Sequence, residues 1–160
     1  MKIVLYQPDI AQNLGAAMRL CACFDVSLAV IEPCGFPLTA KALRRTAMDY
    51  AANIDLIRYK NWADFVNTQN EQGGRTPRAL PRGRIVLLST KASTSMTEFK
   101  FRADDTLLFG RESAGVPDEV HAASHARVHI PINENTRSLN LVSSASIALF
   151  EALRQTNADG

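Results

Sequence analysis

The chain has 160 residues, of which 46% are hydrophobic and 21% are charged, and its formal net charge is +2. This length predicts a single domain with a hydrophobic core of its own. The small net charge excludes a strong electrostatic field over the whole molecule. Any binding of nucleic acid therefore needs a local basic patch or a surface built by two copies.

The N-terminal third predicts an alternation of strand, helix and strand. Residues 3–5 form a short apolar run that is typical of a strand buried on both faces. A helix follows, with Asn13 as its N-cap, and runs to about Phe24; residues 27–31 then form a second buried strand. This rhythm indicates an α/β fold with a mostly parallel sheet flanked by helices.

The next segment is more polar. A helix is predicted over 41–50, with Lys41, Arg44 and Arg45 on one side, followed by a weak strand at 54–57. These three basic residues are candidates for contacts with phosphate groups.

A short helix is predicted at 61–67, and residues 68–83 are rich in glycine and proline, which predicts a loop insertion. Arg75, Arg78 and Arg82 lie in it. They offer contacts to phosphate, but a solvated insertion is the favoured interpretation.

The C-terminal half returns to the sheet. Strands are predicted at 84–89, 106–109 and 128–130, with a turn or loop region at 92–103. The chain ends in a long apolar helix that reaches about residue 154. A ligand in an open α/β sheet binds beyond the carboxyl ends of the strands, so the loops after these strands are the candidate site.

The loop before the last helix is unusually polar. It carries Asn133, Asn135, Arg137, Ser138 and Asn140 within eight residues. A helix N-terminus offers free N–H groups and a positive dipole end, which suit a polar ligand. An ordinary N-cap with a hydrophilic loop remains an equal alternative for this segment alone.

The loop after the strand at 106–109 is bracketed by Gly110 and Gly115. It lacks the lysine of a nucleoside-triphosphate loop, and no G-x-G-x-x-G follows the first strand, so an ATPase and a dinucleotide-dependent oxidoreductase are disfavoured. Glu112 is the acidic group best placed there to meet a cation, with a surface carboxylate as the alternative. Cys21 and Cys23 have no matching His or Cys pair, so we expect free thiols and no metal.

The N-terminus is too short and too polar for a signal peptide, and we expect a cytoplasmic protein with no membrane span.

Several motifs occur in order along nearly the whole chain. They are Asn13-x-Gly15-x-x-x-Arg19, Leu43-Arg44-Arg45, Asp49-Tyr50, Phe109-Gly110-Arg111-Glu112-x-x-Gly115-Val116-Pro117, and Ile130-Pro131 with Arg137-Ser138-Leu139-Asn140-Leu141. With these motifs the chain resembles the SPOUT (knotted) RNA methyltransferases, and most closely the small tRNA ribose 2′-O-methyltransferases that modify the wobble nucleotide.

The resemblance implies a deep trefoil knot at about 85–155 within one domain of residues 1–160, a homodimer, and S-adenosylmethionine as cofactor. It places the adenine on backbone groups of the loops at Leu88, Gly110 and Ile130. Ser138 and Leu139 close this pocket, and Glu112 and Gly115 belong to it. These are the same strand ends that the sequence pattern singles out.

The resemblance also implies a catalytic group. Arg19 is the candidate for stabilising the 2′-alkoxide or binding the adjacent phosphate, because an arginine is too weak a base to remove the proton. Ser138 and Asn140 would orient Arg19 or the hydroxyl. Asn13 would fix the loop that presents Arg19, and Glu112 would pair with it.

The implied substrate is the anticodon stem-loop of tRNA, with a cytidine or modified uridine at the wobble position, held by Lys41, Arg44 and Arg45. The alternatives are another tRNA position, ribosomal RNA, or a non-catalytic RNA-binding dimer. Two departures from the family, Phe150 in place of a tyrosine and Val142 in place of an asparagine, weaken the assignment of the nucleotide.

The last helix bears on assembly. Leu141, Ala145, Ala148 and Ala152 form one apolar stripe, and Val142, Leu149 and Leu153 form another. Two stripes can face both the sheet and a second subunit, so a dimer is expected.

Overall fold

A computed structural model describes residues 1–47, 55–70 and 83–157. The predicted α/β fold with a parallel sheet is confirmed. In chain order the elements are β1 (Lys2–Tyr6), α1 (Ala11–Phe24), β2 (Ser27–Ile31), α2 (Ala40–Ala47), β3 (Ile57–Tyr59), α3 (Trp62–Asn70), β4 (Ile85–Leu88), β5 (Thr94–Ser95), β6 (Thr106–Phe109), α4 (Asp118–Ala123), β7 (Ala126–His129) and α5 (Leu141–Asn157).

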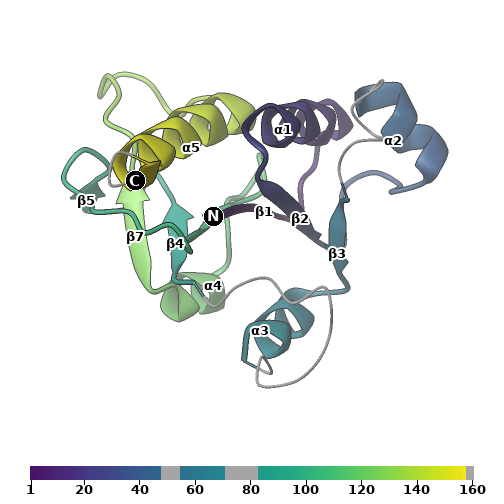
Figure 1. Ribbon diagram of the computed structural model, residues 1–160, viewed down its shortest axis with the longest axis horizontal. Coiled ribbons are helices and arrows are strands. Elements are labelled where there is room, and N and C mark those ends of the chain that lie inside the picture. The colour runs from purple at the N-terminus through teal and green to yellow at the C-terminus, as the bar shows by residue number, and fades with distance from the viewer. Residues whose placement is uncertain (48–54, 71–82, 158–160) are drawn as a thin grey trace.

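The described strands form one seven-stranded sheet in the order β3-β2-β1-β6-β4-β7-β5, and every pair in it is parallel. Helices α1 and α5 cover one face, and α3 and α4 cover the other, as Figure 1 shows. Burial on both faces explains why strands such as β1 and β6 are continuous apolar runs.

The order of the last four strands differs from a doubly wound sheet. From β5 at the edge, the chain must pass β7 and β4 to reach β6. The connection runs on the face that carries α5, because Met96, Phe99 and Phe101 pack in the same core as that helix. Strand β7 thus lies beneath a connection that precedes it in sequence.

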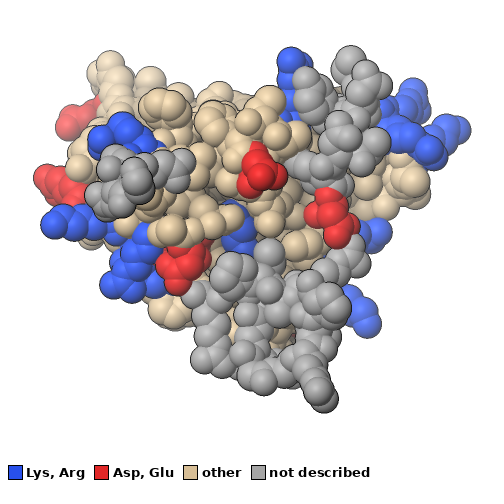
Figure 2. Space-filling view, in the orientation of Figure 1, with Lys and Arg blue, Asp and Glu red and all other residues tan. Residues whose placement is uncertain are grey.

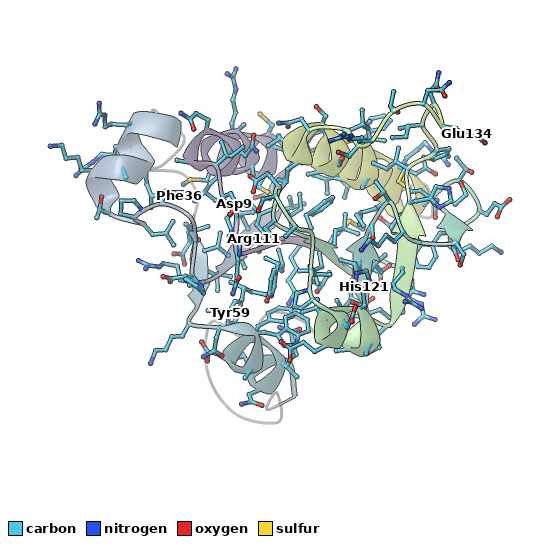
Figure 3. All side chains as sticks on the ribbon, turned by 180° about the vertical axis from the view of Figure 1, so that it is seen from behind. Asp9, Phe36, Tyr59, Arg111, His121 and Glu134 are labelled. Carbon is cyan, nitrogen blue, oxygen red and sulfur yellow. The ribbon has the colours of Figure 1, made fainter. Side chains whose placement is uncertain are left out.

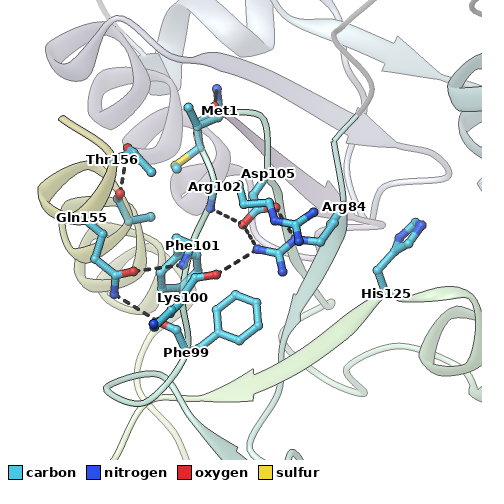
Figure 4. A network of polar contacts seen from close by, with 12 residues as sticks. Met1, Arg84, Phe99, Lys100, Phe101, Arg102, Asp105, His125, Gln155 and Thr156 are labelled. Carbon is cyan, nitrogen blue, oxygen red and sulfur yellow. Dashed lines mark hydrogen bonds and ion pairs between the residues drawn. The ribbon is translucent and has the colours of Figure 1, made fainter. Parts of the chain in front are cut away.

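This connection is held at both sides, as Figure 4 shows. The guanidinium of Arg84 donates to both carboxylate oxygens of buried Asp105, at 2.9 and 2.8 Å, and also lies 5.0 Å from the centre of the Phe99 ring. From α5, the side chain of Gln155 accepts from the backbone N–H of Phe101 at 2.9 Å and donates to the carbonyl of Phe99 at 3.1 Å. Neutral and charged hydrogen bonds together fix residues 99–105 between β4 and the last helix.

Several predicted boundaries are wrong. Helix α1 begins at Ala11 with Ile10 as its N-cap, so Asn13 lies inside the helix and does not cap it. Strand β3 begins at Ile57, where its pairing with β2 starts, whereas the strand predicted from the sequence ends at that residue.

Other differences concern short elements and helix ends. Strand β5 and helix α4 were not predicted, since two and six residues carry too little periodicity. Helix α3 extends to Asn70, beyond the predicted end of 67. The rest of the 41–50 helix and most of the 68–83 insertion, with Arg75, Arg78 and Arg82, lie outside the described residues.

The predicted second stripe of α5 is mostly part of the chain's own core. Leu149 is fully buried, and Val142 and Leu153 pack partly buried against the same cluster. The exposed apolar side chains of the helix are Ile147 and Phe150, which are 41% and 59% exposed. Two stripes on α5 therefore do not by themselves argue for a dimer.

Lys2 is a buried charge at the start of β1. It is 2% exposed, and its ammonium donates to the Gln69 side-chain oxygen at 3.1 Å. No carboxylate among the described residues forms an ion pair with it. Burial lowers the pKa of Lys2 to about 8, because the neutral amine is favoured away from water.

This pKa predicts a pH dependence of folding. Between about pH 8 and the unfolded value of 10.5, the unfolded chain binds more protons, so the Lys2 contribution to the free energy of unfolding rises with pH. Lys2→Met should remove this rise, which amounts to at most roughly 3 kcal/mol at about 1.4 kcal/mol per pKa unit. Urea unfolding of both proteins at pH 7.5 and pH 10 measures the difference. Equal slopes against pH would contradict it.

Candidate functional site

A cavity of about 620 Å³ lies at the carboxyl edge of the sheet. It is built by the loops after β4, β6 and β7, together with the start of α1 and the start of α5. All seven residues predicted to hold the cofactor line it: Leu88, Gly110, Glu112, Gly115, Ile130, Ser138 and Leu139.

The structure places some polar residues of the predicted catalytic set in the cavity and one of them, Arg19, outside it. Asn13 and Asn140 line the cavity with Ser138. Arg19 lies on an exposed side of α1, six residues after Asn13, and is not among the lining residues. The cavity of one chain therefore lacks the arginine that the resemblance implies.

The loop before α5 is likewise only partly in the site. Asn133 forms a local turn, in which its side-chain oxygen accepts from the backbone N–H of Asn135 at 2.9 Å. Neither residue lines the cavity, and nor does Arg137. The polar clustering of this loop thus has two causes, a turn at 133–136 and the site at 138–140.

Asn140 has two functions in the local structure. Its side-chain oxygen accepts from the N–H groups of Val142 at 2.8 Å and Ser143 at 3.3 Å, so it satisfies the first turn of α5. Its amide nitrogen donates to the side-chain oxygen of Asn13 at 3.1 Å. This bond fixes the start of α5 to α1, although 127 residues separate the two partners.

Glu112 continues this chain of hydrogen bonds to the loop after β6. One carboxylate oxygen accepts from the amide of Asn13 at 2.8 Å, and the other accepts from the backbone N–H of Asp9 at 2.7 Å. Both oxygens are thus engaged by neutral donors, and Glu112 works as a structural acceptor. The prediction that it awaits a cation is not supported by this geometry.

Sequence reasoning missed a second carboxylate at the site. Asp9, in the loop between β1 and α1, accepts from Arg111 and from Ser113, and Arg111 and Ser113 also line the cavity. These hydrogen bonds, first from Arg111 and then from Ser113, hold the pKa of the Asp9 carboxyl well below its usual value. The signal available in the sequence was an acidic residue three positions after the end of a buried strand.

Two basic side chains of the cavity were also missed. Lys91 follows β4, and His121 lies on α4, on the opposite face of the sheet from α1 and α5. Figure 3 shows His121 on α4, apart from Asp9 and Arg111. The cavity therefore extends around the sheet edge from one helical layer to the other.

The described residues contain no group of three or more His, Cys, Asp or Glu that could hold a metal ion. Cys21 is buried, Cys34 is half-buried and Cys23 is exposed, and all three are free thiols. Burial raises the pKa of Cys21 to about 12 and, together with nearby Glu32, that of Cys34 to about 11. In the described part of the chain, no helix is both long and apolar enough to cross a membrane.

Known proteins are similar to this chain along nearly its full length. The chain is 50% identical over 156 residues to the tRNA (cytidine(34)-2'-O)-methyltransferase of Beijerinckia indica, a match that covers 98% of this chain and 92% of that protein. The enzyme of the same name from Escherichia coli K12 is 33% identical over 162 residues, with 100% and 96% covered.

Among solved structures, one described as giving structural insights into the 2-OH methylation of C/U34 on tRNA is similar with a TM-score of 0.83 and 39% identity. The match covers 96% of this chain and 94% of that one. The family described as SpoU rRNA Methylase matches residues 1–150. The chain therefore belongs to the SpoU methylase family, which has the knotted SPOUT fold.

Proposed function

We propose that this chain is an S-adenosylmethionine-dependent tRNA 2′-O-methyltransferase that acts on the wobble nucleotide of the anticodon loop. The observation that carries the proposal is the cavity at the carboxyl edge of the sheet, where loops from four distant parts of the chain converge. Full-length relatives named for methylation at cytidine 34 support this substrate.

The cavity fits the cofactor in size and in chemistry. A volume of about 620 Å³ lies in the range of cofactor sites, which is roughly 300–1,000 Å³. A Cβ at Gly115, whose φ is +67°, would meet no other heavy atom within 4 Å, so this residue leaves open space beside the cavity. The backbone at Leu88, Gly110 and Ile130 would hold the adenine, with Leu139 closing the pocket.

When bound, S-adenosylmethionine supplies an electrophilic methyl group on a sulfonium. The chain's own residues must align the ribose 2′-hydroxyl with that methyl and favour loss of its proton. Ser138 lies at the exposed rim of the cavity, where its hydroxyl can orient the substrate oxygen. Arg19 stabilises the developing negative charge or binds the neighbouring phosphate.

The place of Arg19 supports catalysis between two copies. Its side chain is exposed and lies outside the cavity of its own chain. A homodimer that sets α1 of one copy against the cavity of the other would supply the missing guanidinium as the partner subunit's Arg19. The exposed Phe24, Ile147 and Phe150 of α1 and α5 offer apolar surface for such an interface.

Helix α2 provides the phosphate-binding surface in this proposal. Lys41, Arg44 and Arg45 are exposed on it, and α2 packs beside α1. Figure 2 shows Lys and Arg gathered at the edge where α2 lies. A local basic patch of this kind suits RNA even though the net charge of the chain is small.

The cofactor assignment is tested by calorimetric titration. S-adenosylhomocysteine should bind with 1:1 stoichiometry per chain, whereas NAD and ATP should give no measurable heat of binding. Binding of NAD or ATP in preference would contradict the proposal. The substrate assignment is tested by mass mapping of ribose methylation in tRNA from cells with and without the gene.

The role of Arg19 gives a separate prediction. Arg19→Ala should lower the methylation rate by roughly a hundredfold or more, because one group that stabilises transition-state charge is lost. Affinity for S-adenosylhomocysteine should change by less than about twofold, since the proposed contact of Arg19 is with the ribose oxygen or phosphate of the substrate and not with the cofactor. Arg102→Ala, which removes another exposed arginine at the opposite edge of the sheet, is the control. Methylation by Arg19→Ala at the wild-type rate would refute the role.

Catalysis between subunits is tested by mixing two inactive variants. Gly115→Val strains the backbone at a positive φ beside the cavity, and should abolish cofactor binding in its own chain. Refolded together with Arg19→Ala, it should restore one active site per mixed dimer, about half the activity of a wild-type dimer, because the intact cavity of the Arg19→Ala copy receives Arg19 from the other copy. A mixture that stays inactive while mixed dimers form would show that Arg19 acts within its own chain.

A further inference from the structure

The loop at 110–115 is a closed ring of backbone. Arg111 and Gly115 exchange both backbone hydrogen bonds, at 3.0 and 2.8 Å. The ring is so tight that a Cβ on Gly110 would lie 2.6 Å from the carbonyl carbon of Gly115. These contacts fix the shape of the loop itself, so its position relative to the rest of the chain depends on contacts with residues outside it.

Asp9, in the loop between β1 and α1, holds this ring through its carboxylate. One of its carboxylate oxygens accepts from the guanidinium of Arg111 at 2.5 Å, and the other accepts from the hydroxyl and the N–H of Ser113 at 2.6 and 3.1 Å. Figure 3 shows Asp9 and Arg111 directed toward each other. The side chain of Asp9 is 21% exposed, which limits screening of the pair by solvent.

The backbone of the same residue makes a second attachment. The N–H of Asp9 donates to Glu112 at 2.7 Å, and Ile10 then begins helix α1 without any side-chain cap. One residue therefore contacts three consecutive members of the ring, Arg111, Glu112 and Ser113. All three of them line the cavity.

We infer that Asp9 is a positioning residue for the cofactor cavity, which fixes the 110–115 ring against the start of α1 and so sets the affinity for the bound nucleoside. This inference rests on the proposed function, because the ligand is taken to be S-adenosylmethionine or its product. Asp9 itself does not line the cavity and acts through Arg111 and Ser113.

The carboxylate form is what this role requires. Each oxygen of Asp9 faces donors only, the guanidinium on one side and the N–H and hydroxyl of Ser113 on the other. An amide in its place presents an NH₂ group to one of these donor sets, which breaks one attachment and leaves its partners unpaired. Asp9→Asn therefore loosens the ring with almost no change in side-chain volume.

The experiment measures affinity for S-adenosylhomocysteine by calorimetry in wild type, Asp9→Asn, Arg111→Gln and the double variant. Each single variant should bind roughly tenfold to a hundredfold more weakly, as is typical for loss of a hydrogen bond to a charged group. The double variant should be no weaker than about the worse single variant, since both remove one attachment. Glu32→Gln, which breaks the Arg58–Glu32 pair at the end of β2 and β3, is the matched control and should bind as wild type.

Hydrogen exchange of the ligand-free chain gives a readout that a general loss of stability does not mimic. Asp9→Asn should speed exchange at the amides of 111–115 and leave β1 and β6 protected. Faster exchange across the whole sheet, unchanged affinity in Asp9→Asn, or additive losses in the double variant would each overturn the inference. If the wild type fails to bind S-adenosylhomocysteine, the proposed function falls, and the exchange of 111–115 still decides whether Asp9 holds the ring.

Discussion

The carboxylate of Glu112 is the point at which the loops of the cavity meet. It accepts from the backbone of the loop after β1 and from Asn13 of α1, and Asn13 in turn accepts from Asn140 at the start of α5. The segment that contains Asp9 and Asn13 is thereby joined to the loop after β6, about 100 residues later, and through Asn13 to the start of α5. Loss of such an acceptor leaves donors unpaired, at a cost of about 1–3 kcal/mol each.

The hydrogen bonds of Glu112 affect how the cavity binds a ligand. The hydrogen bonds among Glu112, Asn13 and Asn140 join the cavity walls directly to one another and need no ligand to form. A preformed wall reduces the ordering of loops that binding would otherwise require. In the proposed function, chemistry is separated from binding, because the polar walls belong to one chain's loops while Arg19 is exposed on α1 outside the cavity.

The sequence pattern predicted the parts of this arrangement that follow from local periodicity. Buried parallel strands such as β2 and β6 were located to the residue, and the strand ends led to the right cavity. Asn13 was taken for a helix cap because Asn is a good cap, but its partners Glu112 and Asn140 lie far away in sequence. Asp9 was not predicted for the same reason, because its hydrogen-bond partner Arg111 lies 102 residues later in the chain.

Periodicity also says nothing about the order of strands in a sheet. The resemblance implied a knot at about 85–155 without giving the order of the strands, and hydrophobic runs alone predict a doubly wound sheet. Short elements such as β5 are set by pairing with β7 and have no pattern of their own. Contacts between residues far apart in sequence therefore explain both the wrong assignment of Asn13 as a helix cap and the strand β5 that was not predicted.

The connection from β5 to β6 has a consequence for the lifetime of the folded state. It crosses the sheet above β7 and is fastened to β4 by Arg84 and to α5 by Gln155. The C-terminal part of the chain can leave its place beneath this connection only after the hydrogen bonds of Arg84 or those of Gln155 have broken. Contacts that must break before the chain escapes raise the activation barrier to unfolding, so they lengthen the half-life of the folded state at high temperature.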